Sequence, residues 1–331
     1  MAQIIKKEDV IIICILAIIS SFIFFFITNP KQITIAGNTS LIALLSDPLN
    51  THSQNILILG KTGAGNNGSY LTDVILLVNI NFTNNKVTLM SIPRDLLVQI
   101  PNSPKYIKIN GLLAEENALW RQKNQGVKTW NWIKTKVEDI TALKVDNVAI
   151  VDLDGFRYFI DSIGGINIYL EQPLIDPNLS DPDNPNDIFR LEAGWNYLNG
   201  QKAAKFIRSR FGPTGDFYRI THQHDLLAAI FQKLKALNIF SNVPKLLSIW
   251  NSWKGYLFTD IGINEVIKLT KFANNLNKDN LKFITISYNP PDNLLINPGL
   301  SDFGYILIPK QGIENYTEIR EYIHNKLQTN K

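Results

Sequence analysis

The sequence has very little cysteine and histidine, and its positive and negative charges nearly balance. Cys14 is its single cysteine, so no disulfide joins two parts of this chain and its stability must come from an apolar core. The four histidines, at positions 52, 222, 224 and 324, do not have the spacing of a zinc site, and we expect His222 and His224 on a helix surface beside Gln223. A net charge of only +4 argues against nucleic acid as the partner.

Two common loop motifs are incomplete as well. Gly60-Lys61-Thr62 resembles the end of a nucleotide-binding P-loop, but position 55 is asparagine where that motif needs its first glycine. The acidic segment 176–187 (DPNLSDPDNPND) contains prolines and lacks the glycine of an EF-hand, so we expect a solvated loop there. The chain of 331 residues has no internal repeat, and we expect one large domain.

One long hydrophobic run is present near the start of the chain. The uncharged segment Val10–Ile27 would reach about 27 Å as a helix, close to the thickness of a bilayer core. A cleaved signal peptide is the alternative, but Thr28-Asn29-Pro30 does not resemble a small-residue cleavage site. With Lys6 and Lys7 before the run, we expect residues 1–9 in the cytoplasm, an anchor at 10–27, a stem at 28–51 and an extracytoplasmic domain at 52–331.

The start of the expected domain reads as a set of strands. Asn55–Gly60, Val74–Ile80 and Lys86–Ile92 are short apolar runs separated by glycine- and asparagine-rich turns. The near-continuous apolar character of Val74–Ile80 is typical of a strand that is buried on both faces. Val148–Val151 and Ile166–Leu170 also read as strands, with a helix between them, so the class is α/β.

Charged residues follow or precede these strands where α/β folds place their ligands. Asp73 begins the run Val74–Ile80, and Arg94 and Asp95 follow the run Lys86–Ile92 after a proline. A carboxylate at such a position is most often a turn cap. The combination of Asp73 and Asp95 with Arg94 indicates a site for phosphate and a metal ion.

The stretch from Arg208 to Gln223 contains the clearest group of anion-binding side chains. Arg208 and Arg210 are two residues apart, glycine and proline break the chain after them, and Asp216 is placed to cap the helix that follows. Arg219 and Gln223 lie four apart and share one face of that helix. Guanidinium groups bind phosphate bidentately and a helix start favours anions, so we expect a phosphate or diphosphate here. Solvated charges or surface ion pairs are the plainer alternative for any single arginine.

Taken in order, these segments resemble the LytR-CpsA-Psr family over roughly residues 52–235. The resemblance rests on an ordered set of motifs: Ser91-Ile-Pro-Arg-Asp95, Lys108-Ile-Asn110, Asp161-Ser-Ile-Gly-Gly165, Leu198-Asn-Gly-Gln-Lys-Ala203, Arg208-Ser-Arg210 and Asp216-x-x-Arg219-x-x-x-Gln223. Gly304–Pro309 and the helix after it resemble the closing segment of the family.

The resemblance implies a membrane-anchored phosphotransferase that moves a glycopolymer from a polyprenyl diphosphate carrier to peptidoglycan or another envelope acceptor. The implied fold is an α/β/α sandwich around a mixed sheet, after one transmembrane helix. By motif match, the diphosphate would be held by Arg94, Arg208, Arg210, Arg219 and Gln223. Asp73 would ligate Mg²⁺, and Asp95 and Asp216 would orient arginines, with a catalytic base role for Asp95 as the alternative.

The sequence departs from the family pattern at three positions. Thr62 stands where an aspartate is usual, Leu71 stands where an arginine is usual, and His222 replaces an arginine before Gln223. Thr62 and substrate phosphates would then complete the magnesium shell around Asp73. The departure at Thr62 also leaves a second function open, in which the protein binds a lipid diphosphate as a sensor or scaffold without turnover.

Overall fold

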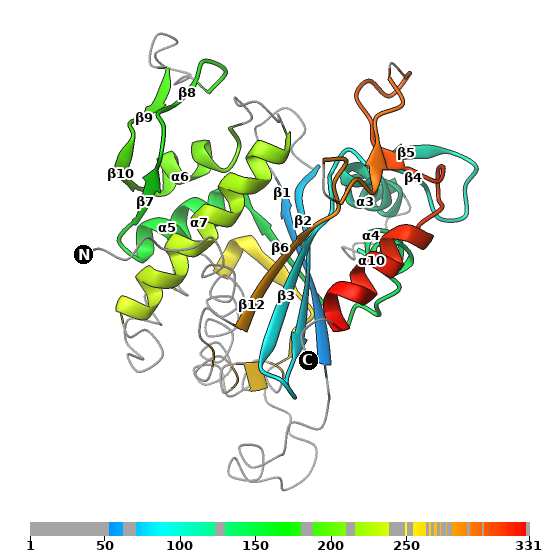
Figure 1. The fold of residues 1–331 in the computed structure, drawn as a ribbon, viewed down its shortest axis with the longest axis horizontal. Helices are drawn as coiled ribbons and strands as arrows, with labels where there is room; N and C mark the ends of the chain where they lie inside the picture. Colours follow the sequence, from blue (N-terminus) through cyan, green and yellow to red (C-terminus); the bar gives the residue numbers. More distant parts are fainter. Residues whose placement is uncertain are drawn as a thin grey trace, which may run out of the picture. The chain divides into compact units, whose positions relative to one another are not determined.

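The computed structural model is divided into two compact units (Figure 1). The sheet unit comprises Thr51–Leu153, Leu257–Ile261 and Lys282–Lys331, and the α7 unit includes Asp154–Tyr256 and Gly262–Leu281. The residues described are 53–61, 71–122, 130–179, 188–209, 216–237, 254–262, 280–289, 292–299 and 301–328, with single residues at 249, 265, 268, 269, 272 and 276. The predicted anchor and stem lie outside these residues. None of the helices within them is long and apolar enough to cross a membrane.

A six-stranded mixed sheet forms the centre of the sheet unit. Its strand order is β11-β6-β1-β2-β3-β12, which confirms the predicted α/β class and mixed sheet. β1 runs parallel to β6 and antiparallel to β2, and β2 runs antiparallel to β3. The bounds are β1 Ser53–Lys61, β2 Thr72–Asn81, β3 Lys86–Ser91, β6 Asn147–Asp152, β11 Leu257–Thr259 and β12 Leu281–Thr285.

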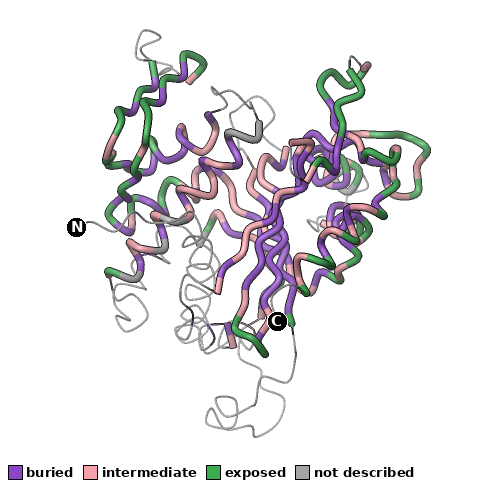
Figure 2. Tube along the Cα trace, viewed as in Figure 1, coloured by how far each residue is buried: buried purple, intermediate pink, exposed green. Residues whose placement is uncertain are grey.

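The apolar side chains of these strands form the core of the sheet unit. Leu57, Leu59, Leu77, Val78 and Leu89 are all fully buried. In Figure 2 the central strands are accordingly drawn mostly as buried, with intermediate residues among them. This pattern agrees with the near-continuous apolar sequence of β2, because a strand covered on both faces needs apolar side chains on both.

Asn55 holds a polar junction inside this apolar core. Its side-chain oxygen accepts from Asn79 Nδ2 at 2.8 Å, and its own Nδ2 donates to the carbonyl of Lys144 at 2.8 Å. The Asn55 backbone amide donates to Asp146 at 2.9 Å. Position 55, where a P-loop would need glycine, therefore joins β1 to β2 and to the residues before β6.

Three helices and two small sheets complete the sheet unit. In Figure 1, α4 and α10 lie side by side, and α3 packs on α4. Helix α4 begins at Asn131, and Leu96 forms a bridge with Leu307. The bounds are β4 Leu97–Gln99, β5 Tyr106–Lys108, η2 Ile109–Gly111, α3 Leu112–Gln122, α4 Asn131–Thr141, β13 Leu295–Ile296, β14 Ile308–Pro309 and α10 Thr317–Gln328.

The α7 unit is built from helices and two-stranded sheets. β7 packs on α7, and the two strand pairs are β7 with β10 and β8 with β9. The helix expected to follow Asp216 is present as α7. The bounds are α5 Leu153–Ser162, β7 Ile166–Leu170, β8 Leu174–Asp176, β9 Phe189–Leu191, β10 Gly194–Leu198, α6 Gly200–Phe206, α7 Asp216–Ala236 and η4 Lys254–Tyr256. A sandwich with helices on both faces of the sheet stays a prediction.

Candidate functional site

Asp73 is placed by an irregularity at the end of the β1–β2 pair. Gly60 pairs with Val74 and Lys61 pairs with Thr72, so Asp73 is the extra residue of a β-bulge. Glycine at position 60 eases this close approach, because a Cβ atom there would lie 3.0 Å from Val74 Cβ and the two strands would have to shift. A bulge redirects a side chain out of the regular alternation of a strand, and such bulges are common beside active sites.

The bulge directs Asp73 to Arg94, which follows β3. Arg94 Nη1 donates to Asp73 Oδ1 at 2.5 Å, and the two side chains are 12% and 25% exposed. The backbone around Arg94 is also fixed: its carbonyl accepts from the Asn110 amide at 3.3 Å, and Thr72 Oγ1 donates to the Asn110 carbonyl at 3.1 Å. The residues that the sequence placed at two strand ends therefore meet in the sheet unit.

Asp95 is buried and lies between two cations. Its Oδ1 accepts from Lys108 Nζ at 3.1 Å, and its Oδ2 forms an ion pair with Arg94 Nε at 3.4 Å. Because both carboxylate oxygens contact cations, the geometry favours the orienting role of Asp95 over the base role. No role was predicted for Lys108, although it lies in one of the family-like motifs.

A second pair of opposite charges lies at the carboxyl-terminal ends of β1 and β6, at the same edge of the sheet as Asp73. Lys61 Nζ is 3.9 Å from Asp152 Oδ2 and 5.3 Å from the centre of the Phe258 ring. Asp152 could not be predicted as a site residue, because an aspartate that ends a short strand is most often a turn cap. Thr62, the next residue after Lys61 and the second predicted metal ligand, lies outside the described residues.

The described side chains around Asp73 could form only part of a magnesium site. Within the described ranges, no group of three or more histidine, cysteine or carboxylate residues is arranged to hold a metal ion. Asp73 supplies one hard carboxylate at the edge of the sheet. Mg²⁺ commonly binds one or two carboxylates together with substrate phosphates and water, so Asp73 fits that mode and does not form a complete site alone.

Within the α7 unit, two of the family-like motifs meet at the start of α6. The Gly200 amide donates to Asp161 Oδ1 at 2.7 Å, and Asn199 caps the helix by accepting from the Lys202 amide at 2.9 Å. A Cβ atom on Gly200 would lie 2.3 Å from the Arg157 carbonyl, so only glycine allows this approach to α5. These contacts fix α6, which leads directly into the arginine stretch.

The backbone beside Arg208 is held by a buried aspartate. Ser209 Oγ donates to Asp176 Oδ2 at 2.7 Å, and both residues are buried. Arg208 Nε donates to the Ala204 carbonyl at 3.1 Å. The expectation that the segment from Asp176 is a solvated loop is therefore wrong for Asp176 itself, because it ends β8 and fixes Ser209.

Arg219 and Gln223 lie one turn apart on α7, as their spacing predicts. Arg219 is 3% exposed and Gln223 is half-buried. The prediction that His222 lies on the helix surface is wrong: its imidazole is buried and stacks on the Phe206 ring, with centroids 4.5 Å apart. His222 therefore packs against Phe206 of α6 at the position where the family usually has a charged arginine. Arg210 and the Asp216 side chain lie outside the described residues.

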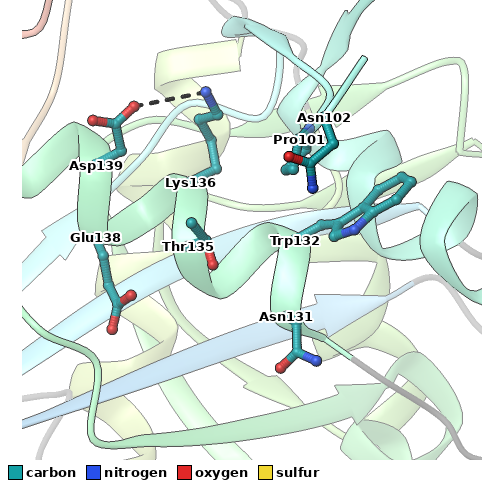
Figure 3. Close-up of a pocket in the computed structure, with 8 residues that line it drawn as sticks. All are labelled: Pro101, Asn102, Asn131, Trp132, Thr135, Lys136, Glu138 and Asp139. Carbon is teal, nitrogen blue, oxygen red and sulfur yellow. Dashed lines mark ion pairs between the residues drawn. The ribbon is translucent and has the colours of Figure 1, made fainter.

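A wide, open cavity occurs elsewhere in the sheet unit (Figure 3). Its volume is about 710 Å³, and an adjoining cavity of about 450 Å³ shares Pro101, Asn102 and Lys136 with it. Lys136 forms ion pairs with Glu314 at 2.7 Å and with Asp139 at 3.7 Å. The cavity contains none of the predicted site residues. It is lined by Pro101, Asn102, Asn131, Trp132, Thr135, Lys136, Glu138 and Asp139.

Solved structures with the same fold are known. The chain superposes on the crystal structure of TagV from Bacillus subtilis with a TM-score of 0.62 and 22% identity, covering 83% of this chain and 97% of that one. A structure described as TagT bound to LI-WTA gives a TM-score of 0.55 and 19% identity, covering 88% and 97%. At these identities the likeness establishes the fold.

The sequence also matches characterised relatives at low identity. It is 26% identical over 286 residues to the cell wall biosynthesis protein LcpA of Corynebacterium glutamicum, covering 81% of this chain and 52% of the relative. It is 26% identical over 219 residues to the polyisoprenyl-teichoic acid–peptidoglycan teichoic acid transferase TagV of B. subtilis, covering 65% and 51%. The chain spans about half the length of these relatives. The family model matches residues 28–318, and the chain belongs to the LytR_cpsA_psr family.

Proposed function

We propose that this protein transfers a glycopolymer from a polyprenyl diphosphate carrier to peptidoglycan or another acceptor of the cell envelope. The observation that carries the proposal is the group Asp73, Arg94, Asp95 and Lys108, in which a guanidinium is held between two carboxylates at the edge of the sheet. The name of TagV, a teichoic acid transferase, supports the same reaction class.

In this proposal the acceptor hydroxyl oxygen attacks the phosphorus that carries the glycan. The bond between that phosphorus and the bridging oxygen breaks, polyprenyl phosphate leaves, and the hydroxyl proton is released. Phosphoryl transfer depends mainly on positioning and on neutralising the charge of the phosphate oxygens. The guanidinium groups of Arg94, Arg208, Arg210 and Arg219 would supply that neutralisation, because such groups bind phosphate bidentately. The Gln223 amide would add a hydrogen bond to a phosphate oxygen.

The carboxylates have supporting roles. Asp95 keeps the Arg94 guanidinium in place through its contact with Nε at 3.4 Å, and Lys108 in turn fixes the Asp95 carboxylate at 3.1 Å. Asp73, with Thr62, would hold Mg²⁺, which when bound neutralises diphosphate charge. The apolar run Val10–Ile27 would anchor the chain so that its main domain faces the lipid carrier outside the cytoplasm.

Transfer by the full-length protein in liposomes is the direct test. With a polyprenyl diphosphate-linked glycan, peptidoglycan fragments and Mg²⁺, wild type should form a phosphodiester-linked product. Arg94→Ala should lower the rate about a hundredfold or more, since it removes charge stabilisation of the transferring group. Arg190→Ala is the matched control, because this exposed arginine of β9 is paired with Glu192 at 2.5 Å.

A binding protein without turnover is the second candidate, and Thr62 is the observation that favours it. Loss of one expected anionic ligand weakens a magnesium site and thus the transfer step. Under this alternative, wild type binds the lipid diphosphate and forms no product at any magnesium concentration. That result would overturn the transferase proposal while leaving the arginine group as a binding site.

A further inference from the structure

The outer face of the β7–β10 pair displays three large aromatic side chains to solvent. Tyr169 is 54% exposed, Trp195 is 62% exposed and Tyr197 is 57% exposed. Trp195 pairs directly with Tyr169 across the two strands, and their ring centroids are 5.5 Å apart with planes at 68°. Asn167, which pairs with Tyr197, completes this face, and we call these four residues the aromatic face.

The opposite side of the same strand pair is buried. Ile166, Ile168 and Leu198 alternate with the exposed residues and belong to the core, and β7 packs on α7. Strand alternation therefore fixes which side chains point outward. Exposed aromatic side chains gathered on one face of a rigid element commonly mark an interaction site, whereas scattered ones do not.

Local contacts keep the aromatic face rigid. Asn196 bridges the turn into β10: its Oδ1 accepts from the Glu192 amide, and its Nδ2 donates to the Glu192 and Gly194 carbonyls at 2.7 and 3.0 Å. The Tyr197 ring lies over Gly165, where a Cβ atom would be 2.5 Å from the ring. A surface that is already ordered loses little entropy when it binds a ligand.

The chemistry of the aromatic face suits an uncharged, hydroxyl-rich ring. Its polar groups are the Asn167 amide, the indole N–H and two phenol hydroxyls, none of which is a charged group at neutral pH. The nearby Arg190 and Glu192 neutralise each other at 2.5 Å. A pyranose ring presents an apolar C–H face that can stack on an aromatic ring and hydroxyls that can bond to the polar groups at its edge. Anionic lipids and nucleic acids instead require clustered lysine and arginine.

We propose that the aromatic face binds a polysaccharide strand of the cell envelope. The choice of an envelope polysaccharide rests on the proposed function, whereas the stacking surface does not. The distance between the aromatic face and Arg219 agrees with a long ligand. The face lies beside Lys233 of α7, whose Nζ donates to the Gly164 carbonyl, just before β7, at 3.0 Å. Arg219 lies fourteen residues earlier on the same helix, roughly 21 Å away along its axis.

Binding to insoluble peptidoglycan and to a soluble β-1,4-linked N-acetylglucosamine hexamer tests this assignment. With the full-length protein in detergent, Trp195→Ala and Tyr169→Ala should each weaken binding about tenfold, measured by co-sedimentation and calorimetry. Phe303→Ala is the matched control, because Phe303 is an aromatic residue of the sheet unit that is 45% exposed. It should bind as wild type does.

Unchanged binding by Trp195→Ala and Tyr169→Ala, or equal losses in Phe303→Ala, would overturn the proposal. Vesicles of neutral and anionic phospholipid form a second arm. If the two variants lose vesicle binding and keep glycan binding, the face is a membrane-contact surface and the glycan assignment is wrong. Arg208→Ala separates this inference from the proposed transfer, because it should weaken diphosphate binding and leave glycan binding intact.

Discussion

Single residues in this protein are held by partners that lie far away in the sequence. Ser209, between the two arginines of the Arg-Ser-Arg motif, is fixed by Asp176, which lies 33 residues earlier. This contact is buried, so the backbone beside Arg208 does not depend on a ligand for its conformation. A guanidinium on such a backbone loses less entropy when it binds an anion than one on a flexible loop.

Arg208→Ala should therefore weaken binding of a polyprenyl diphosphate markedly. One charge-assisted contact contributes about 1.5–3 kcal/mol, which corresponds to about a ten- to hundredfold change in affinity. Titration of the full-length protein in detergent gives the dissociation constants. Arg190→Ala removes the same charge from an exposed pair in the same unit and should leave the affinity unchanged. Equal affinities for wild type and Arg208→Ala would remove Arg208 from the binding site.

Tyr316 gives a residue-scale prediction for alkaline pH. Burial, reinforced by the nearby carboxylates of Glu314 and Asp139, raises the pKa of Tyr316 far above its ordinary value of 10.0. The folded state therefore keeps the phenol protonated at a pH where the unfolded chain has already lost the proton. The stability contributed by this group is complete below pH 10 and is lost as the pH rises above it.

Tyr316→Phe keeps the buried ring and removes the titrating hydroxyl. The free energy of unfolding of the variant should fall less steeply above pH 10 than that of wild type, by up to about 1.36 kcal/mol per pH unit. Urea unfolding at pH 9 and pH 11 measures the difference. Tyr106→Phe, at a surface position of β5 that is 37% exposed, is the control and should reproduce the wild-type slope. Parallel pH profiles for Tyr316→Phe and wild type would contradict the prediction.

At the scale of elements, the register of β1 depends on Asn55. Asn55→Ala would leave the Asn79 amide and the Lys144 carbonyl without their bonds at 2.8 Å. A buried polar group that loses its partner costs about 1–3 kcal/mol. Urea unfolding should show a loss of that size, while Asn84→Ala, in the exposed turn between β2 and β3, should change stability by about 0.5 kcal/mol or less. If Asn55→Ala unfolded at the same urea concentration as wild type, the polar junction at Asn55 would not stabilise the sheet.

The longer strands and α7 could be predicted because each shows a clear apolar run or a helical spacing in the sequence. The apolar runs 74–80 and 86–92 and the helical spacing after Asp216 became β2, β3 and α7 with shifts of a few residues at most. The short strands β8 and β9 could not be predicted, since three residues are too few to display a period. Their pairing depends on contacts between distant segments.

The local geometry of the candidate site shows the same division. Glycine at the end of one strand and aspartate at the start of the next were visible in the sequence, but the bulge that directs Asp73 to Arg94 arises from the register between β1 and β2. The burial of His222 depends in the same way on α6, which brings Phe206 to the helix. Sequence spacing gave the residue types of the site, and tertiary pairing decides which of them touch.

At the scale of the whole molecule, the predicted anchor would fix the side of the membrane on which the site works. The family match begins at residue 28, directly after the apolar run Val10–Ile27. The short basic flank before that run indicates a cytoplasmic N-terminus under the positive-inside rule. The residues proposed to bind phosphate would then face the extracytoplasmic leaflet, where a lipid-linked glycan would be presented to them.

This arrangement leads to a prediction about magnesium in the intact protein. Asp73 is the remaining carboxylate of the two expected ligand positions, and Thr62 offers a neutral oxygen in place of the other. A diphosphate would add negative oxygens that the protein lacks, so Mg²⁺ should bind weakly to the protein alone and appreciably with a diphosphate lipid analogue.

Calorimetry of the full-length protein in detergent, with and without the analogue, distinguishes these states. Thr62→Asp should strengthen Mg²⁺ binding to the protein alone, because it restores an anionic ligand, and Asp73→Ala should abolish binding in both conditions. Asp302→Ala, which removes an exposed carboxylate from a turn of the sheet unit, is the control and should leave both affinities unchanged. If Thr62→Asp and Asp73→Ala both bind Mg²⁺ as wild type does, the metal is held elsewhere. The charge at the reacting phosphate would then be neutralised by the arginines alone.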